Sequence, residues 1–217
     1  VPFSGGRDST YTLHFLKKEL GMNPIAFTYD WGMVTDLARR NIARVCGSLG
    51  VENIIVAADI YQKRNYIRQN LLAWLQRPSL GMVPIFMAGD KQFFYYTNKV
   101  KKQTGIKLNV WGINDLEKTQ FKSGFAGVSP NFNGEHIFSL STIQKIQLSK
   151  FIITSFLKNT KYINSSLFDN FKGHFSRITH SQSDFLSFFD YHQWDENEIN
   201  NLLANEYGWE RAIDTNS

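Results

Sequence analysis

The sequence has a single cysteine, Cys46, which rules out an internal disulfide framework and a cysteine-rich zinc site within these 217 residues. No apolar run approaches the roughly 18 residues that cross a bilayer. The five histidines follow neither the H-x-x-x-H nor the H-E-x-x-H spacing of metal sites. We therefore expect a cytoplasmic protein without a structural zinc ion, in which Cys46 is a core residue on the apolar side of a helix.

Composition and charge are those of a folded, mildly basic chain. Hydrophobic residues make up 42% and aromatic residues 15%, which is enough to bury a core and argues against disorder. The formal net charge of +5 fits an ordinary basic enzyme. It also fits a protein with an anionic partner such as a nucleotide, a nucleotide-linked sugar or RNA.

Strand and helix patterns alternate along the first part of the chain. This alternation predicts an α/β fold with a parallel sheet covered by helices on both faces, whose ligands bind beyond the carboxyl ends of the strands. We expect an α/β domain over 1–130 and a mainly helical region over 131–217. The predicted strands are 1–3 (the end of a strand), 24–29, 52–57 and 108–112, and the predicted helices are 9–20, 36–49, 60–76, 85–104, 142–158 and 195–207.

A glycine-containing loop, S-G-G-R-D-S-T at residues 4–10, lies between the first strand end and the first predicted helix. Two adjacent glycines allow a tight turn that exposes consecutive N–H groups, and the helix start adds its dipole and its unpaired donors. With the hydroxyls of Ser4, Ser9 and Thr10, these groups form an anion cradle. The motifs G-x-x-x-x-G-K-[ST] and G-x-G-x-x-G are absent. An ordinary capped turn is the structural alternative.

The loop resembles the pyrophosphate-binding S-G-G-x-D-S loop of the N-type ATP pyrophosphatases, the PP-loop superfamily. The resemblance implies an adenine nucleotide alpha hydrolase-like fold and cleavage of ATP to AMP and pyrophosphate. It implies that Asp8 helps to hold magnesium and that Arg7 fills the variable position. The residues then expected to bind ATP are Ser4, Gly5, Gly6, Arg7, Asp8, Ser9, Thr10, Thr28, Tyr29, Asp30 and Gly112.

Four further segments, 27–32, 81–91, 111–125 and 208–212, resemble the N-acetyl sugar amidotransferases of surface-polysaccharide biosynthesis, including lipopolysaccharide. That family is expected to convert the acetamido group of a nucleotide-linked sugar into an acetamidino group. The amide oxygen is first adenylated, because an amide carbonyl is a poor electrophile with a poor leaving group. The resemblance implies that ammonia comes from a separate glutaminase with a cyclase-like barrel companion.

Outside the loop, the candidate residues are polar groups that follow predicted strands or lie in the resembling segments. Glu117 is a candidate for magnesium or for accepting a proton from ammonia, and Lys122 for pairing with phosphate. Asp90, Lys91 and Asn114 are candidates for binding the sugar substrate. Each also has an ordinary structural interpretation, since Glu117 can be a solvated helix-start carboxylate and the lysines can be surface residues.

Other functions stay open at this point. The first is a tRNA-modifying enzyme of the same superfamily, although the chain lacks paired cysteines for sulfur relay and a basic-aromatic stripe for stacking bases. A non-catalytic nucleotide binder and a structural subunit with a relic loop are further alternatives. We also expect segments to be missing at both ends of the sequence.

Overall fold

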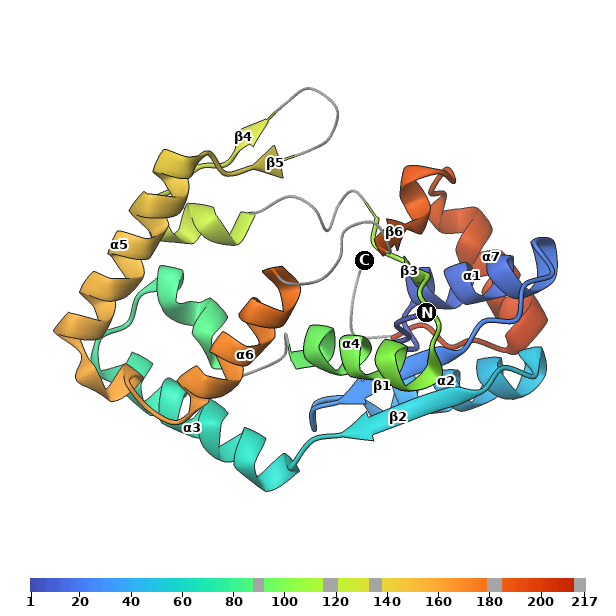
Figure 1. Cartoon of the computed structure of the whole chain (residues 1–217), viewed down its shortest axis with the longest axis horizontal. Coiled ribbons are helices and arrows are strands. Elements are labelled where there is room, and N and C mark those ends of the chain that lie inside the picture. Colours follow the sequence, from blue (N-terminus) through green and yellow to red (C-terminus); the bar gives the residue numbers. More distant parts are fainter. Residues whose placement is uncertain (88–91, 115–120, 133–137, 179–184, 213–217) are drawn as a thin grey trace. The chain divides into compact units, whose positions relative to one another are not determined.

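The computed structural model describes residues 1–87, 92–114, 121–132, 138–178 and 185–212 (Figure 1). Among these residues, no helix combines the length and the apolar character needed to cross a bilayer. The architecture is α/β, with short parallel strands and many helices.

The chain forms two compact units that interleave along the sequence, whereas the sequence predicts a division at residue 130. The first, which we call the loop unit, comprises Val1–Ala58, Tyr96–Asn114 and Ser181–Ser217. The second, the helical unit, comprises Asp59–Tyr95 and Asp115–His180. The described C-terminal residues are therefore grouped with the glycine loop.

The strands of the loop unit pair in parallel, as the alternating pattern predicts. Strand β1 (Ala26–Asp30) pairs with β2 (Asn53–Ala57) over their whole length. The segment Val1–Phe3 runs along the other edge of β1, where Phe3 N–H donates to Phe27 O at 2.7 Å. This position confirms that the loop follows the end of a strand-like segment.

A second parallel pair joins β3 (Asn109–Trp111) to β6 (Phe185–Ser187), two elements 76 positions apart by their first residues. The sequence predicts β3 but not β6, because β6 lies in an aromatic stretch without clear periodicity. Such a pairing depends on contacts distant along the chain.

Four of the helices that the structure describes belong wholly or partly to the loop unit. Helix α1 (Arg7–His14) continues as a π-helical turn over Phe15–Glu19. Helix α2 (Asp36–Leu49) begins at the Thr35 cap and ends at Gly50 in the left-handed conformation, as its sequence signals predict. Helix α7 (Glu196–Tyr207) is capped by Asp195 and ends at Gly208. Helix α4 (Gln92–Thr104) contributes its residues from Tyr96 onward.

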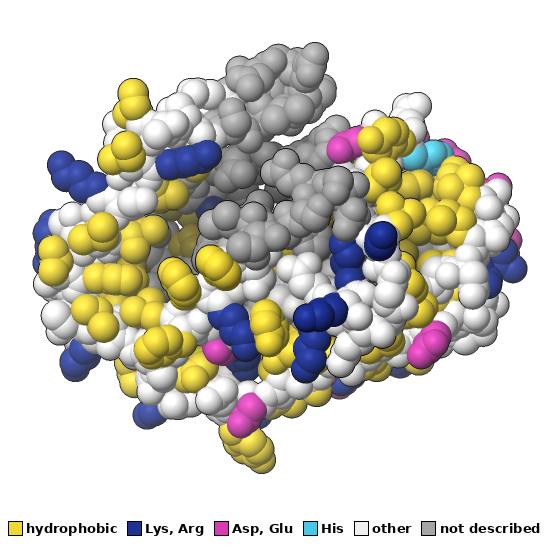
Figure 2. Space-filling model, in the orientation of Figure 1, with side chains coloured by type: hydrophobic (Ala, Val, Ile, Leu, Met, Phe, Trp, Pro, Cys, Tyr) yellow, Lys and Arg dark blue, Asp and Glu magenta, His cyan; other side chains and the backbone are white. Residues whose placement is uncertain are grey.

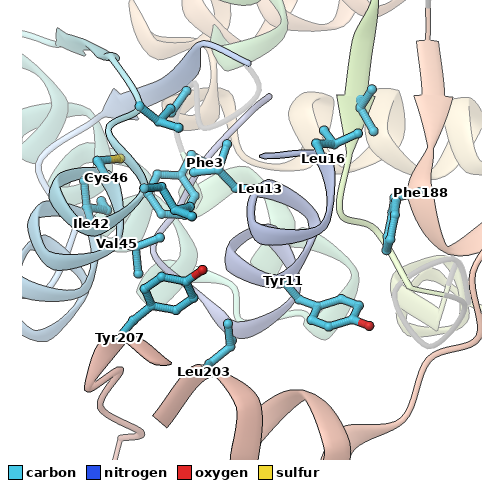
Figure 3. Close-up of a cluster of buried hydrophobic side chains, with 14 of the residues drawn as sticks. Phe3, Tyr11, Leu13, Leu16, Ile42, Val45, Cys46, Phe188, Leu203 and Tyr207 are labelled. Carbon is cyan, nitrogen blue, oxygen red and sulfur yellow. The ribbon is translucent and has the colours of Figure 1, made fainter. Parts of the chain in front are cut away.

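The core of the loop unit lies where α1, α2 and α7 meet (Figure 3). Leu13 of α1, Val45 of α2 and Leu203 of α7 have no solvent exposure. Cys46 is part of this core, and burial raises the pKa of its thiol to about 11. The interpretation of Cys46 as a core residue is confirmed, and a thiol with so high a pKa is a poor nucleophile at neutral pH.

The helical unit is built on α3 (Ile60–Gln76), α5 (Thr142–Lys158) and α6 (Ser166–Ile178). Both α3 and α5 have the predicted bounds, whereas α6 was not predicted. The helix expected over 85–104 was wrong at its start, because residues 80–87 form 3-10 turns around Pro84 and α4 begins at Gln92. The remaining described elements are a 3-10 segment at Phe121–Ala126, the short antiparallel strands β4 (Asn131–Phe132) and β5 (Phe138–Ser139), and 3-10 turns at Thr160–Tyr162 and Phe188–Asp190, the last of these in the loop unit.

Two features mark the helical unit. The Lys63 ammonium is buried and donates to Gln92 Oε1 at 3.2 Å and to the Asp169 carboxylate. At the surface, hydrophobic side chains gather over α5 and α6 (Figure 2), where Leu157, Phe168 and Phe171 are each more than 70% exposed. The buried ion pair fixes α3 to α6, while much of the apolar surface of α5 and α6 faces outward.

The substitution Leu203→Ala is expected to lower the free energy of unfolding by about 2–5 kcal/mol, because it leaves a cavity among α1, α2 and α7. Urea unfolding followed by circular dichroism measures the effect. The matched control is Leu20→Ala, the same substitution in the same unit at a side chain that is 57% exposed. Equal losses in the two variants would contradict the assigned core.

Stability is expected to fall on acidification because of His14. This side chain is buried, its Nδ1 lies 2.6 Å from the Tyr207 hydroxyl, and burial lowers its pKa despite Glu19 and Glu206. The unfolded chain therefore binds the proton more readily than the folded protein. The free energy of unfolding is then highest above pH about 6.5 and decreases as the pH falls below that value. Urea midpoints measured between pH 7.5 and 5.5 should drop for the wild type and change less in His14→Gln. Parallel pH dependence in both proteins would contradict this assignment.

Candidate functional site

Gly5 fixes the path of the loop. Its φ is +76°, and a Cβ atom there would lie 2.6 Å from Ala38 O and 2.8 Å from Ile42 Cγ1. Both the backbone conformation and the close approach to α2 therefore require glycine. The loop is pressed against the first turns of α2, as well as leading into α1.

The hydroxyls of the loop divide into inward and outward groups. Ser9 and Thr10 are buried, and both hydroxyls donate to Gly6 O, at 3.1 and 2.7 Å. Ser4 is exposed; its Oγ accepts from Gly6 N–H at 3.3 Å and lies 3.2 Å from Ser9 Oγ. Ser4 and Gly6 are thus the groups placed to meet a ligand, while Ser9 and Thr10 hold the turn.

The first helix begins at Arg7, two residues earlier than Ser9, the predicted start. Its N-cap is Gly6, and no side chain caps the first turn. The first-turn N–H groups and the positive end of the helix dipole therefore lie within the loop itself, where they favour an anion.

The Asp8 carboxylate accepts hydrogen bonds from three donors. Its Oδ1 accepts from Trp194 Nε1 at 3.0 Å and from Arg7 Nε at 3.1 Å, and its Oδ2 accepts from Asn114 Nδ2 at 2.6 Å. The carboxylate has room for about four acceptor contacts, so three donors orient it and leave capacity for one more ligand. Asn114, which the sequence predicts to be a sugar-binding residue, holds Asp8 in this structure.

Arg7 is held from three directions. Beside its contact with Asp8, its Nη1 lies 2.6 Å from Glu196 Oε1, and the guanidinium stacks over the Trp194 ring with 4.9 Å to the centroid. Its side chain is 19% exposed. These contacts attach the loop to the start of α7.

Gly112 brings the end of β3 against α1. A Cβ atom at this position would lie 2.6 Å from Thr12 Oγ1 and 2.7 Å from Asp8 O. Only glycine permits this approach without a shift of the α1 backbone. Gly112 therefore lies against α1 next to Asp8, and this placement explains how Asn114 reaches Asp8.

The side chains at the end of β1 are engaged inside the unit. The Thr28 hydroxyl donates to Phe3 O at 2.7 Å, and the Tyr29 ring stacks on Tyr96 with centroids 5.1 Å apart. Asp30 is buried, with Oδ2 lying 2.6 Å from Arg39 Nη2. None of these three side chains lines the pocket described below.

The C-terminal segment Gly208–Ala212 lies on the loop and on α2. Trp209 Nε1 donates to Gly5 O at 3.0 Å. The backbone of Glu210 exchanges two hydrogen bonds with the Asn41 amide, at 2.9 and 3.0 Å. The Glu210 carboxylate pairs with Arg40 and Arg44, and their hydrogen bonds lower its pKa.

A pocket of about 340 Å³ opens between these elements of the loop unit. Its wall is formed by the loop, the start of α2, α7 and the C-terminal segment. The lining residues are Ser4, Gly5, Gly6, Arg7, Asp8, Thr35, Leu37, Ala38, Asn41, Asn200, Trp209, Glu210, Arg211 and Ala212.

Four further candidate residues do not belong to the described part of the loop unit. Asp90, Lys91 and Glu117 lie outside the described residues. Lys122 is exposed in the 3-10 segment of the helical unit. Among the described residues, no group of three or more His, Cys, Asp or Glu side chains is placed to hold a metal.

Sequence reasoning missed Trp194, Glu196 and Asn41. Trp194 and Glu196 flank Asp195, the N-cap of α7, where a capping pattern explains the local sequence without reference to the loop. The family resemblance of residues 208–212 pointed to the segment that contains Trp209. It did not indicate that Trp209 contacts Gly5. A scan against known protein families finds no matching family, and a search of curated proteins finds no match.

The substitution Gly5→Ala is expected to destabilise the loop unit by roughly 1–3 kcal/mol and to abolish the ATP binding that the loop motif predicts, because the added Cβ collides with α2. Thermal unfolding and ATP titration measure the two effects. Gly47→Ala is the control: this α2 glycine has open space around its Cβ position, so alanine should stabilise the helix by up to about 1 kcal/mol. A stable Gly5→Ala variant that still binds ATP would refute the assigned role of the loop.

Proposed function

We propose that the loop unit binds ATP and that the protein cleaves it to AMP and pyrophosphate. The observation that carries this proposal is the cradle at the start of α1. A glycine-locked turn, an exposed serine and an uncapped helix N-terminus face one pocket. Backbone N–H groups together with a helix dipole favour a phosphate group. The S-G-G-x-D-S resemblance assigns that phosphate to the β,γ part of ATP.

The strand arrangement supports an adenine nucleotide alpha hydrolase-like fold for this unit. The segment Val1–Phe3, β1 and β2 form one parallel run, and β3 pairs in parallel with β6. The loop follows the first of these strands and Gly112 follows β3. A parallel sheet with its ligand beyond the strand ends fits this placement.

Asp8 would hold magnesium together with ATP phosphates. The carboxylate lines the pocket and is oriented by three donors, which suits an ion that is usually bound through one or two carboxylates plus substrate oxygens. Magnesium would supply charge neutralisation of the phosphates. Trp194 and Asn114 would keep the Asp8 oxygens aimed at the same point.

The proposed reaction is the amidination of a nucleotide-linked acetamido sugar. The acetamido oxygen attacks the α-phosphorus of ATP and pyrophosphate leaves. Ammonia from a partner glutaminase then attacks the activated carbon, and AMP leaves with the former amide oxygen. The loop binds the departing pyrophosphate, which lowers the barrier of the first step. The sugar, the glutaminase partner and the roles of Glu117, Lys122, Asp90 and Lys91 rest on the family resemblance.

The reaction can be tested by phosphorus NMR of the full protein with ATP, magnesium, ammonium and a panel of nucleotide-linked acetamido sugars. AMP and pyrophosphate should appear only with a sugar, whose mass should change by the exchange of oxygen for NH. ADP and orthophosphate would overturn the proposal. AMP release with bulk tRNA and with none of the sugars would favour the tRNA-modifying alternative.

The substitution Asp8→Asn is expected to lower the turnover of ATP by about 10²–10³, because the neutral amide cannot hold the metal and loses charge-assisted contacts. Binding of the sugar, followed by calorimetry, should persist. The control Asp36→Asn removes a carboxylate from the exposed first turn of α2, outside the pocket lining. Equal loss of turnover and sugar binding in Asp8→Asn would show that Asp8 is structural.

A further inference from the structure

We propose that Arg211 is a phosphate-binding residue that pairs with the pyrophosphate half of ATP. This inference rests on the proposed function and adds a residue from the C-terminal segment to the nucleotide site. The residue touches the polyphosphate directly and makes the pocket selective for ATP and pyrophosphate over AMP.

The pocket has few positive charges for a highly anionic ligand. Among the described residues that line it, the lysine and arginine side chains are those of Arg7 and Arg211. The β,γ-phosphates of ATP, and still more free pyrophosphate, carry several negative charges that a helix terminus only partly neutralises. Cationic side chains at the pocket wall are therefore the natural partners of this ligand.

Arg7 is already committed to the protein. Its guanidinium contacts the Asp8 and Glu196 carboxylates and lies over the Trp194 ring. Two carboxylates offset its charge, and its side chain is only 19% exposed. Moving Arg7 to a phosphate would break these contacts, so Arg7 serves mainly to orient Asp8.

Arg211 differs in each of these respects. Its side chain is 49% exposed, and its Nη2 lies 3.8 Å from Glu196 Oε1, near the limit of an ion pair. Glu196 makes a much closer contact with Arg7, at 2.6 Å. An exposed pair of this length contributes little to stability, so Arg211 can turn to a ligand at small cost.

The backbone that carries Arg211 is nevertheless fixed beside the loop. Trp209 is bonded to Gly5 O, and Glu210 is bonded through its backbone to Asn41. Arg44 Nη1 donates to Gly208 O at 2.9 Å. The segment thus places a half-exposed guanidinium with only a long ion pair at the pocket wall, and its planar fork can bind two phosphate oxygens at once.

Binding of pyrophosphate, ATP and AMP to the full protein, measured by calorimetry in magnesium buffer, tests this assignment. Arg211→Ala should weaken pyrophosphate and ATP binding at least about tenfold and leave AMP binding unchanged, because a hydrogen-bonded charge is lost only at the β,γ position. Arg211→Lys should keep part of the affinity. The control Arg68→Ala removes an exposed arginine from α3 in the helical unit and should bind all three ligands normally.

The possible outcomes distinguish a failure of the Arg211 assignment from a failure of the proposed ATP-binding function. If the wild type binds neither ATP nor pyrophosphate, both fail. If the wild type binds them and Arg211→Ala binds pyrophosphate equally well, only the role of Arg211 fails. Equal weakening of AMP and pyrophosphate would mark Arg211 as structural and overturn the assignment. Arg211→Lys retains the positive charge and the long side chain, so it gives a second measurement if the alanine variant is unstable.

Discussion

The close approach of Gly5 to helix α2 is the constraint on which the site depends. A positive φ and a distance too short for any side chain hold the loop against Ala38 and Ile42. The same contact fixes Gly5 O, which accepts the Trp209 indole. One glycine therefore sets the path of the loop, the start of α1 and the position of the C-terminal segment. The pocket is the space left between these three elements.

Asp8 extends this constraint across the unit. Its three donors come from Arg7, from Trp194 near α7 and from Asn114 after β3. A carboxylate held by so many donors loses little entropy when it meets a metal or a ligand. The Asp8 carboxylate thus connects the loop, the end of β3 and the residues before α7. A shift in any of these elements would change the orientation of the carboxylate.

Local signals predicted much of the fold. Thr35 and Gly50 mark the ends of α2, and α3 and α5 have the bounds that their periodicity indicates. Capping and turn signals depend on residues that are neighbours along the chain, so the sequence alone is enough to locate these helix ends. Helix α6 and strand β6 escaped prediction because they lie in aromatic-rich stretches where helix and strand periodicity are hard to tell apart.

The site was predictable only in its local part. The loop motif and Gly112 were identified, since each is a short pattern at the end of a strand-like segment. The Trp194 contact with Asp8 joins residues 186 positions apart, and no periodic or capping pattern encodes such a distance. Gly5 and Gly112 contribute through the close approach of their backbones, which a short motif can indicate. The orientation of Asp8 depends on hydrogen-bond donors that only the tertiary fold brings to it. The motif therefore predicts the place of the proposed phosphate site, whereas the side chains that surround it are known only from the packed unit.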